Sequence, residues 1–316
     1  MKNFKKIAII TLIISSVSVG MGLFILYSSE SSLEDFVSAV ENFINMKNTN
    51  IKKSDIINID EEYSYKLGNE KLLHIDSKIS NIEIKTSTAD EIVFKIKGNI
   101  NKKHCRDYLD IKKDGNSFEV KILKNANKNV SILNLGKLNI EIIIPENKFK
   151  EINYITVSGD ILIEDLNLEK LDIDSISGNV HLDKGKVNEL TCSLVSGNLF
   201  STSTTDKINC DSVSGEVEVL NAYKVNIETI SGDIIVKSKN IGDKSYLNSL
   251  SGNIKLYSSN LNEIDIYLDS LEESINYNNN KISISKFYDF NSFAEDQINT
   301  LNIETMSGDI EIFDEN

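Results

Sequence analysis

Hydrophobic and polar residues alternate with a period of two over the second half of the chain, and one alternating unit recurs from residue 152 onward. Aligning the copies on the Ser-Gly pair that each contains leaves three positions almost always hydrophobic. Such alternation puts these positions on one face of β-strands, which we expect to be buried. Six residues before the serine stand Ile152, Leu171, Leu190, Ile208, Val225, Ser245 and Leu301; four before it stand Tyr154, Ile173, Cys192, Cys210, Ile227, Leu247 and Ile303; three after it stand Ile161, Val180, Leu199, Val217, Ile234, Ile254 and Ile310.

The Ser-Gly pairs mark turns between the strands. Successive serines are 19, 19, 18, 17, 20 and 56 residues apart, and the last interval equals about three units. Glycine reaches backbone conformations that cost other residues more, and the Asp or Asn that usually follows it is expected to bond its own backbone. Repeats of 17–20 residues predict an all-β, β-helix-like solenoid of stacked units, or rungs. The predicted turn residues are Ser158, Gly159, Ser177, Gly178, Ser196, Gly197, Ser214, Gly215, Ser231, Gly232, Ser251, Gly252, Ser307 and Gly308.

The regularity of the pattern sets the expected boundaries. Residues 152–316 form the regular solenoid, with a degraded copy in which Glu272-Glu273 replaces Ser-Gly and a loop excursion near residues 277–297. Residues 60–151 are also strand-rich but less regular. Within them, residues 74–84 look like a worn copy of the unit, and residues 138–145 alternate up to the only proline. We predict that residues 60–151 are entry rungs and an N-terminal cap.

The N-terminus carries a continuous hydrophobic run instead. Residues 7–27 contain no charge and are long enough to span a bilayer, and lysines precede them while acidic residues follow. The positive-inside rule then predicts a cytoplasmic tip at residues 1–6, a transmembrane anchor at residues 7–27, and a single-pass membrane protein with an extracytoplasmic solenoid. The alternative is a cleaved signal peptide with Ser16-Val17-Ser18 as its cleavage site, which would release a secreted protein.

Residues 28–59 are expected to hold a short amphipathic helix and a linker. Ser32 is a suitable N-cap, and apolar residues recur behind it at helical spacing on one face. This helix is either a stalk that packs on the membrane surface or on the first rung, or a self-association helix. Its apolar residues are Leu33, Phe36, Val37, Val40, Phe43 and Ile44.

Charge narrows the possible ligands. The net charge of −14 argues against nucleic-acid binding, which needs a basic face, and against docking on anionic lipid. Arg106 is the only arginine, so the usual bidentate clamp for carboxylates and phosphates is missing from any proposed site. Acidic polysaccharides are therefore disfavoured as ligands.

The repeats resemble those of a bacterial family of β-strand-repeat proteins of unknown function, described as putative adhesins. The matching segments are Ile143-Ile144-Pro145, Tyr154-Ile-Thr-Val-Ser-Gly-Asp-Ile161 and its copies, over roughly residues 70–313. The resemblance implies a right-handed β-helix-like fold tethered to the cell envelope, an adhesive role proposed from architecture, and no assigned catalytic residues. This chain departs from the family pattern by losing Ser-Gly between residues 252 and 307.

Three sets of residues are candidates for chemistry. A nucleophilic serine needs an adjacent base, and His74, His104 and His181 do not recur with the Ser-Gly pairs, so we interpret the pairs as structural. The Asp and Asn residues beyond the glycines suit calcium, but the glycine-rich pattern of calcium-binding rolls is absent, which favours a solvated ladder. Cys192 and Cys210 should stack in adjacent rungs as core thiols or, alternatively, as a disulfide, and the sequence indicates no partner for the third cysteine.

No residue set implies a metal or a cofactor. We expect a non-enzymatic surface binding or adhesion scaffold whose outward residues contact an envelope polymer or a membrane protein. The alternative is an accessory regulator or sensor in a cell-envelope stress response, acting through the amphipathic helix. A β-helix enzyme acting on polysaccharides is a third, disfavoured interpretation, because it needs basic residues or paired carboxylates in one groove.

Overall fold

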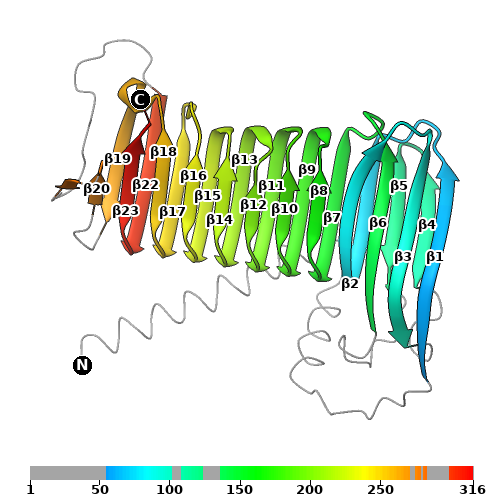
Figure 1. The fold of residues 1–316 in the computed structure, drawn as a ribbon. Helices are drawn as coiled ribbons and strands as arrows, with labels where there is room; N and C mark the ends of the chain where they lie inside the picture. Colours follow the sequence, from blue (N-terminus) through cyan, green and yellow to red (C-terminus); the bar gives the residue numbers. More distant parts are fainter. Residues whose placement is uncertain are drawn as a thin grey trace.

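Parallel strands stack into two facing sheets, A and B, and form an elongated solenoid (Figure 1). The computed structural model describes residues 55–101, 108–123, 136–270, 275–278, 280–282 and 299–315. Each regular rung gives one strand to sheet B and, after the Ser-Gly corner, a shorter strand to sheet A. These rungs are β7 (Glu151–Ser158) with β8 (Ile161–Glu164), β9 (Asn167–Ser177) with β10 (Val180–Asp183), β11 (Lys186–Ser196) with β12 (Leu199–Ser201), β13 (Thr204–Ser214) with β14 (Val217–Leu220), β15 (Ala222–Ser231) with β16 (Ile234–Lys237), and β17 (Ser245–Ser251) with β18 (Ile254–Ser258).

The rungs stack in the register that the Ser-Gly alignment predicts. Ser158 pairs with Ser177, Ser177 with Ser196, and Ser196 with Ser214, all in parallel ladders. Parallel pairing in sheet B needs a connection that returns the chain to the end of the sheet where the previous strand began. The short strand of sheet A, with a corner on either side, supplies this connection. The expected all-β solenoid with rungs of 17–20 residues is confirmed, while its right-handed coiling stays a prediction.

The core lies between the two sheets and is built from the three aligned hydrophobic positions. Every residue at these positions is at most 1% exposed, as the alternating pattern predicts. Ser245 is the polar exception, and hydrogen bonds compensate for its burial: its hydroxyl accepts from the Val225 amide at 3.1 Å and donates to the Gly242 carbonyl at 2.8 Å. Neighbouring rungs bury each other's apolar faces, so the stack forms one continuous core.

The C-terminal rung is inserted between two rungs that precede it in sequence. β22 (Asn299–Ser307) and β23 (Ile310–Asp314) pair with β17 and β18 on one side. On the other side they pair with β19 (Ile264–Ser270) and β20 (Ile275–Tyr277), which follow the 3₁₀ turn η3 (Leu261–Glu263). The pairing of Leu268 with Ile303 and of Ile275 with Ile310 agrees with the prediction that Glu272-Glu273 replaces Ser-Gly.

The N-terminal end combines one entry rung with antiparallel strands. β2 (Leu72–Ser87) runs through both sheets and pairs in parallel with β7 and β8, and its Ile79 lies opposite Ser158, so residues 74–84 are a worn copy as expected. Outside it, sheet A continues through the parallel β6 (Gly136–Pro145) to the antiparallel β3 (Glu91–Asn101) and β1 (Ile56–Lys66). Sheet B ends in a hairpin of β4 (Leu109–Asp114) and β5 (Ser117–Ile122).

Strands extend across two of the predicted boundaries. β1 begins at Ile56, so residues 56–59 belong to the cap and not to the linker, since Ile56 pairs with Asn101 of β3. The loop excursion predicted near residues 277–297 begins with a regular strand, because β21 (Asn280–Ile282) forms an antiparallel hairpin with β20. The predicted cytoplasmic tip, transmembrane anchor and amphipathic helix lie outside the described residues, as do residues 283–298. Within the described residues no helix is long and apolar enough to cross a membrane.

Candidate functional site

The Ser-Gly corners bring the backbones of neighbouring rungs into close contact. A Cβ atom added to Gly197 would lie 2.0 Å from the carbonyl oxygen of Gly178, and one added to Gly215 would lie 2.0 Å from that of Gly197. The Gly197 amide also donates to the Ser214 carbonyl at 3.2 Å, which links this corner to the next rung. Glycine is therefore needed at the corner because no side chain fits between the rungs.

The residues that follow the glycines form a ladder of side-chain hydrogen bonds between rungs, the Asx ladder. Oδ1 of Asp160 accepts from the backbone amide of Asn179 at 2.8 Å, and Oδ1 of Asn179 accepts from the amide of Asn198 at 3.1 Å. Each side chain thus bonds the next rung and not its own backbone, so the local Asx turn expected from the sequence is wrong. The same pattern joins Asn198 to Glu216, Asp233 to Asn253, and Asn253 to Asp309.

The Asx ladder is interrupted at one rung. Glu216 occupies the Asx position, and in the described part of the chain no bond runs from its side chain to the amide of Asp233. In the bonded steps of the ladder the Oδ1 atoms already accept hydrogen bonds from N–H donors. The ladder therefore needs no cation to stabilise it. Among the described residues no group of three or more His, Cys, Asp or Glu side chains is placed to hold a metal ion.

A hollow on the outer face of sheet A is the candidate binding site. It is open to solvent, has a volume of about 690 Å³, and lies where the entry strands meet the first regular rungs. One side is the Asx ladder, and the other is the column of outward residues four positions after the corner serine. Its outward-facing lining comprises Asn81, Lys97, Asn139, Asp160 and Asn179 along the ladder, with Glu83, Lys95, Glu141, His181 and the apolar Leu162 along the column.

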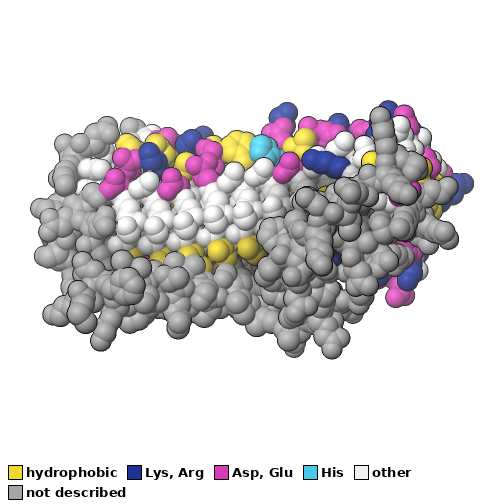
Figure 2. All heavy atoms as spheres, turned by 90° about the horizontal axis from the view of Figure 1, so that it is seen from below, with side chains coloured by type: hydrophobic (Ala, Val, Ile, Leu, Met, Phe, Trp, Pro, Cys, Tyr) yellow, Lys and Arg dark blue, Asp and Glu magenta, His cyan; other side chains and the backbone are white. Residues whose placement is uncertain are grey.

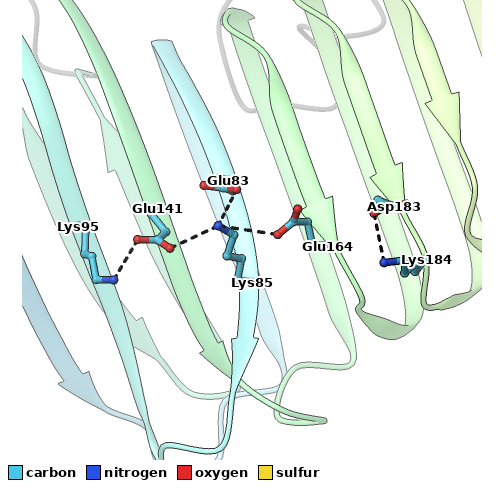
Figure 3. A network of polar contacts seen from close by, with 7 residues as sticks. All are labelled: Glu83, Lys85, Lys95, Glu141, Glu164, Asp183 and Lys184. Atoms are coloured by element: carbon cyan, nitrogen blue, oxygen red, sulfur yellow. Dashed lines mark hydrogen bonds and ion pairs between the residues drawn. The ribbon is translucent and has the colours of Figure 1, made fainter.

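Ion pairs join three carboxylates and two lysines along one edge of the hollow, which Glu83, Lys95 and Glu141 line (Figure 3). The Lys85 ammonium lies 2.7 Å from a carboxylate oxygen of Glu83, 3.6 Å from Glu141 and 3.8 Å from Glu164. Glu141 also accepts from Lys95 at 3.0 Å, and this bond, helped by the nearby Lys85, holds the pKa of Glu141 below its usual range. The lysines here are already neutralised by carboxylates, so the hollow offers no free cationic clamp for an acidic ligand.

A patch of aromatic and aliphatic side chains extends from the other end of the hollow. The rings of His181 and Phe200 pack with centroids 5.4 Å apart, and Leu162 pairs with His181 in the rung before. Figure 2 shows one histidine beside hydrophobic side chains, with charged groups further along the same edge. Further toward the C-terminal end the same face carries stacked Tyr257 and Phe313 rings, 4.6 Å apart. Sheet A therefore presents rings and amides side by side.

The family can be assigned from the repeat region. The sequence model of the family described as Toastrack DUF4097 matches residues 71–313, which is about three quarters of the chain. The chain belongs to the Toastrack DUF4097 family. The match confirms the resemblance drawn from the repeats, and its limits coincide with β2 and β23, so the family unit is the solenoid together with most of its cap.

Several solved structures overlap the Toastrack solenoid with low sequence identity. A putative lipid binding protein from Parabacteroides distasonis is 17% identical with a TM-score of 0.48, covering 82% of this chain and 97% of that chain. A putative adhesin from Bacteroides fragilis is 14% identical with a TM-score of 0.43, covering 82% and 96%. A putative cell adhesion protein from Clostridium sporogenes is 14% identical with a TM-score of 0.32, covering 82% and 100%. No curated protein matches the chain.

The cysteines of the Toastrack repeat lie where the alignment places them. Cys192 and Cys210 pair directly across adjacent rungs, and both are buried and free. The hydrogen bond with Cys210 and burial raise the pKa of the Cys192 thiol, so it stays protonated and unreactive at neutral pH. Cys105 and His104 lie outside the described residues, and His181 points outward as its strand pattern predicts.

The outer face of sheet B carries an acidic column three positions before the corner serine. Asp211 is exposed, yet neighbouring rungs partly desolvate its carboxylate, and this burial, with the adjacent charge of Glu228, raises its pKa. At the neighbouring outward position of sheet B, the carboxylate of Asp172 forms an ion pair with the Lys170 ammonium at 2.6 Å. The surroundings of Asp211 thus disfavour its charge, whereas those of Asp172 favour it.

The residues of the hollow were not predicted from the sequence. Lys95 and Glu141 come from antiparallel cap strands that carry no Ser-Gly marker, so alignment of the repeats could not bring them beside Leu162. The neighbouring patch could have been found, because residues four positions after the corner serine include Leu162, His181 and Phe200 in three successive copies. These positions face outward and do not define the core, so the alternating pattern assigns them no role.

Proposed function

We propose that the protein is a membrane-anchored, extracytoplasmic, non-enzymatic scaffold that binds an envelope polysaccharide on the outer face of sheet A. The observation that carries the proposal is the hollow on the face of a β-sheet, where an amide ladder meets the ring of His181, with the half-buried Phe200 ring packed beside it. A rigid β-sheet orders these groups before a ligand arrives, so binding loses little conformational entropy. The anchor at residues 7–27 would hold this surface at the membrane.

The expected ligand is neutral or carries amino groups. Lys95 and Lys97 beside the hollow are paired with Glu141 and Asp60, at 3.0 and 3.6 Å, and the protein carries a net charge of −14. An acidic polymer would be repelled, whereas an uncharged sugar ring can lie on the His181 and Phe200 rings and hydrogen-bond to the amides. Non-enzymatic binding fits the corner serines, whose repeated position serves the stacking of the rungs.

Retention of purified polysaccharide by the full-length protein in detergent tests the proposal. Phe200→Ala is expected to weaken binding roughly fivefold to tenfold, because it removes one ring of the packed pair. Tyr267→Ala is the matched control, since Tyr267 is an exposed aromatic residue of β19 on sheet B, away from the hollow. Equal losses for the two variants, or no retention of neutral and amino-sugar polymers by the parent protein, would refute the proposal.

A further inference from the structure

A column of aliphatic residues runs along the outer face of sheet B, immediately before the corner serines. The residue before each of them is buried, as Thr156 and Ser212 are, so strand alternation turns these aliphatic side chains outward. They are half-buried, apart from Met306, which is 44% exposed. The members of this apolar column are Val157, Ile176, Val195, Val213, Ile230, Leu250 and Met306.

The solenoid fold does not require an apolar column on its outside. The outward positions three and five residues before the serine are mostly polar, with Asp174, Asp211 and Asn209 as examples. The seven rungs are consecutive in the stack, because β22 follows β17, and six spacings of about 4.8 Å give a length of about 29 Å. Figure 2 shows hydrophobic side chains along one edge of the pale band of small polar groups and backbone. A surface of this kind is typical of a docking site.

We infer that residues 32–46 of the same chain pack along the apolar column as an amphipathic helix. The segment carries apolar residues on one helical face, and 15 residues at 1.5 Å each give a helix of about 22 Å, which covers between four and five rungs. Apolar side chains from the helix would complete the burial of the half-buried column. The outer face of sheet A stays open in this arrangement.

The position of β1 makes this contact reachable. β1 is separated from β7 by β3, β6 and β2, so four strand spacings amount to about 19 Å. Asp60 aligns with Lys97, Asn139 and Asn81, which lie at the corner that carries the Asx ladder. Ile56 therefore lies beyond that corner, on the edge that borders the apolar column. Residues 47–55 span up to about 30 Å when extended, enough to bridge the distance.

The linker also sets the direction of the helix. The C-terminal end of the helix must lie near the first rungs, because residues 47–55 connect it to β1. Ile44 then lies near Ile176, and Leu33, about 16 Å further along the helix, lies three to four rungs toward the C-terminal end, near Ile230. The helix and the order of the rungs therefore run in opposite directions.

Disulfide mapping in the full-length protein tests both contact and direction. In a Cys105→Ser background, Ile44→Cys is paired with either Ile176→Cys or Leu250→Cys, the protein is oxidised in membranes, and the bonds are identified by mass spectrometry. The yield with Ile176→Cys is expected to exceed that with Leu250→Cys by roughly tenfold, since only the near pair shares a high effective concentration. With Leu33→Cys, the preferred partner shifts to Ile230→Cys over Val157→Cys.

Equal yields at all rungs, bonds only between two chains, or no bonds would each overturn the inference. A second measurement needs no new thiols: Val195→Lys is expected to speed protease cleavage of residues 47–55 several-fold by weakening helix packing. Thr191→Lys is its control, because Thr191 is an outward, half-buried residue of the same strand outside the column, and an equal acceleration there would count against the contact. Neither readout involves the proposed polysaccharide, so the two proposals fail independently.

Discussion

Replacing a corner glycine in the middle of the solenoid tests whether backbone contact between rungs holds the stack together. Gly197 has φ of +149°, and a Cβ there would lie 2.0 Å from the oxygen and 2.8 Å from the carbon of the Gly178 carbonyl. Those atoms are backbone and belong to a hydrogen-bonded corner, so they cannot move aside as a flexible side chain would. Gly197→Ala must displace one rung from the next.

The cost can be worked from two contributions. A non-glycine residue held at such a φ costs about 1–3 kcal/mol, and forcing a methyl group into a packed contact costs about 1–3 kcal/mol more. We therefore expect Gly197→Ala to lower the free energy of unfolding by about 2–5 kcal/mol. Gly115→Ala separates the two contributions, because Gly115 has φ of +56° in the β4–β5 turn and a Cβ added there would meet no atom within 4 Å. That variant should lose only about 1–2 kcal/mol.

Urea unfolding of the full-length protein in detergent, followed by circular dichroism, measures both variants. Because a solenoid can open locally between rungs, hydrogen exchange of β11 and β13 supplies a second reading of the same change. Faster exchange is expected on both sides of Gly197 and not near Gly115. Equal destabilisation by the two substitutions, with unchanged exchange in β11 and β13, would refute the role given to the close contact.

The Asx ladder, the acidic column and the buried thiols can each be tested by one substitution. Glu216→Asn should stabilise the protein by about 0.5–1.5 kcal/mol in urea unfolding, because it completes the ladder, whereas Glu216→Gln should not. The pKa of Asp211 is higher in the folded protein than its unfolded value of about 3.9, so at pH values above about 4 its negative charge destabilises the folded state. Asp211→Asn should therefore raise the melting temperature at pH 7 but not below about pH 4. Asp172→Asn, which loses an ion pair, should not raise it at pH 7. In Cys105→Ser protein, Cys192 should react with a thiol reagent only after unfolding, and rapid native labelling would contradict its burial.

The core could be predicted from the sequence because its signal is local and repeated. Leu171, Leu190 and Ile208 occupy the same place in successive units, and their alternation with polar neighbours fixes which face is buried. The order of the last rungs could not be predicted. The units around Glu272 and Ser307 have the same internal spacing, so nothing local indicates which of them pairs with β17.

The candidate site could not be predicted from the sequence, for a similar physical reason. β3 pairs antiparallel with β6, and its residues alternate just as those of a rung do, so Lys95 gives no sign of where it lies. The network of Lys85 with Glu141 and Glu164 joins residues from three strands that only the assembled cap brings together. Most outward residues vary from rung to rung because the core does not constrain them.

The inserted C-terminal rung bears on how the protein is made. β19 and β20 leave the ribosome before β22 and β23, yet among the described strands those later ones are their parallel neighbours. A growing chain therefore carries an unpaired β19 edge until β22 and β23 have been made, and this end of the solenoid closes only then. A chain that stops before β22 would keep that edge open, and the edge of β18 that faces β23 would be unpaired beside it. Exposed strand edges of this kind promote aggregation and proteolysis. The position of one rung thus makes the pairing of two earlier strands depend on two later ones.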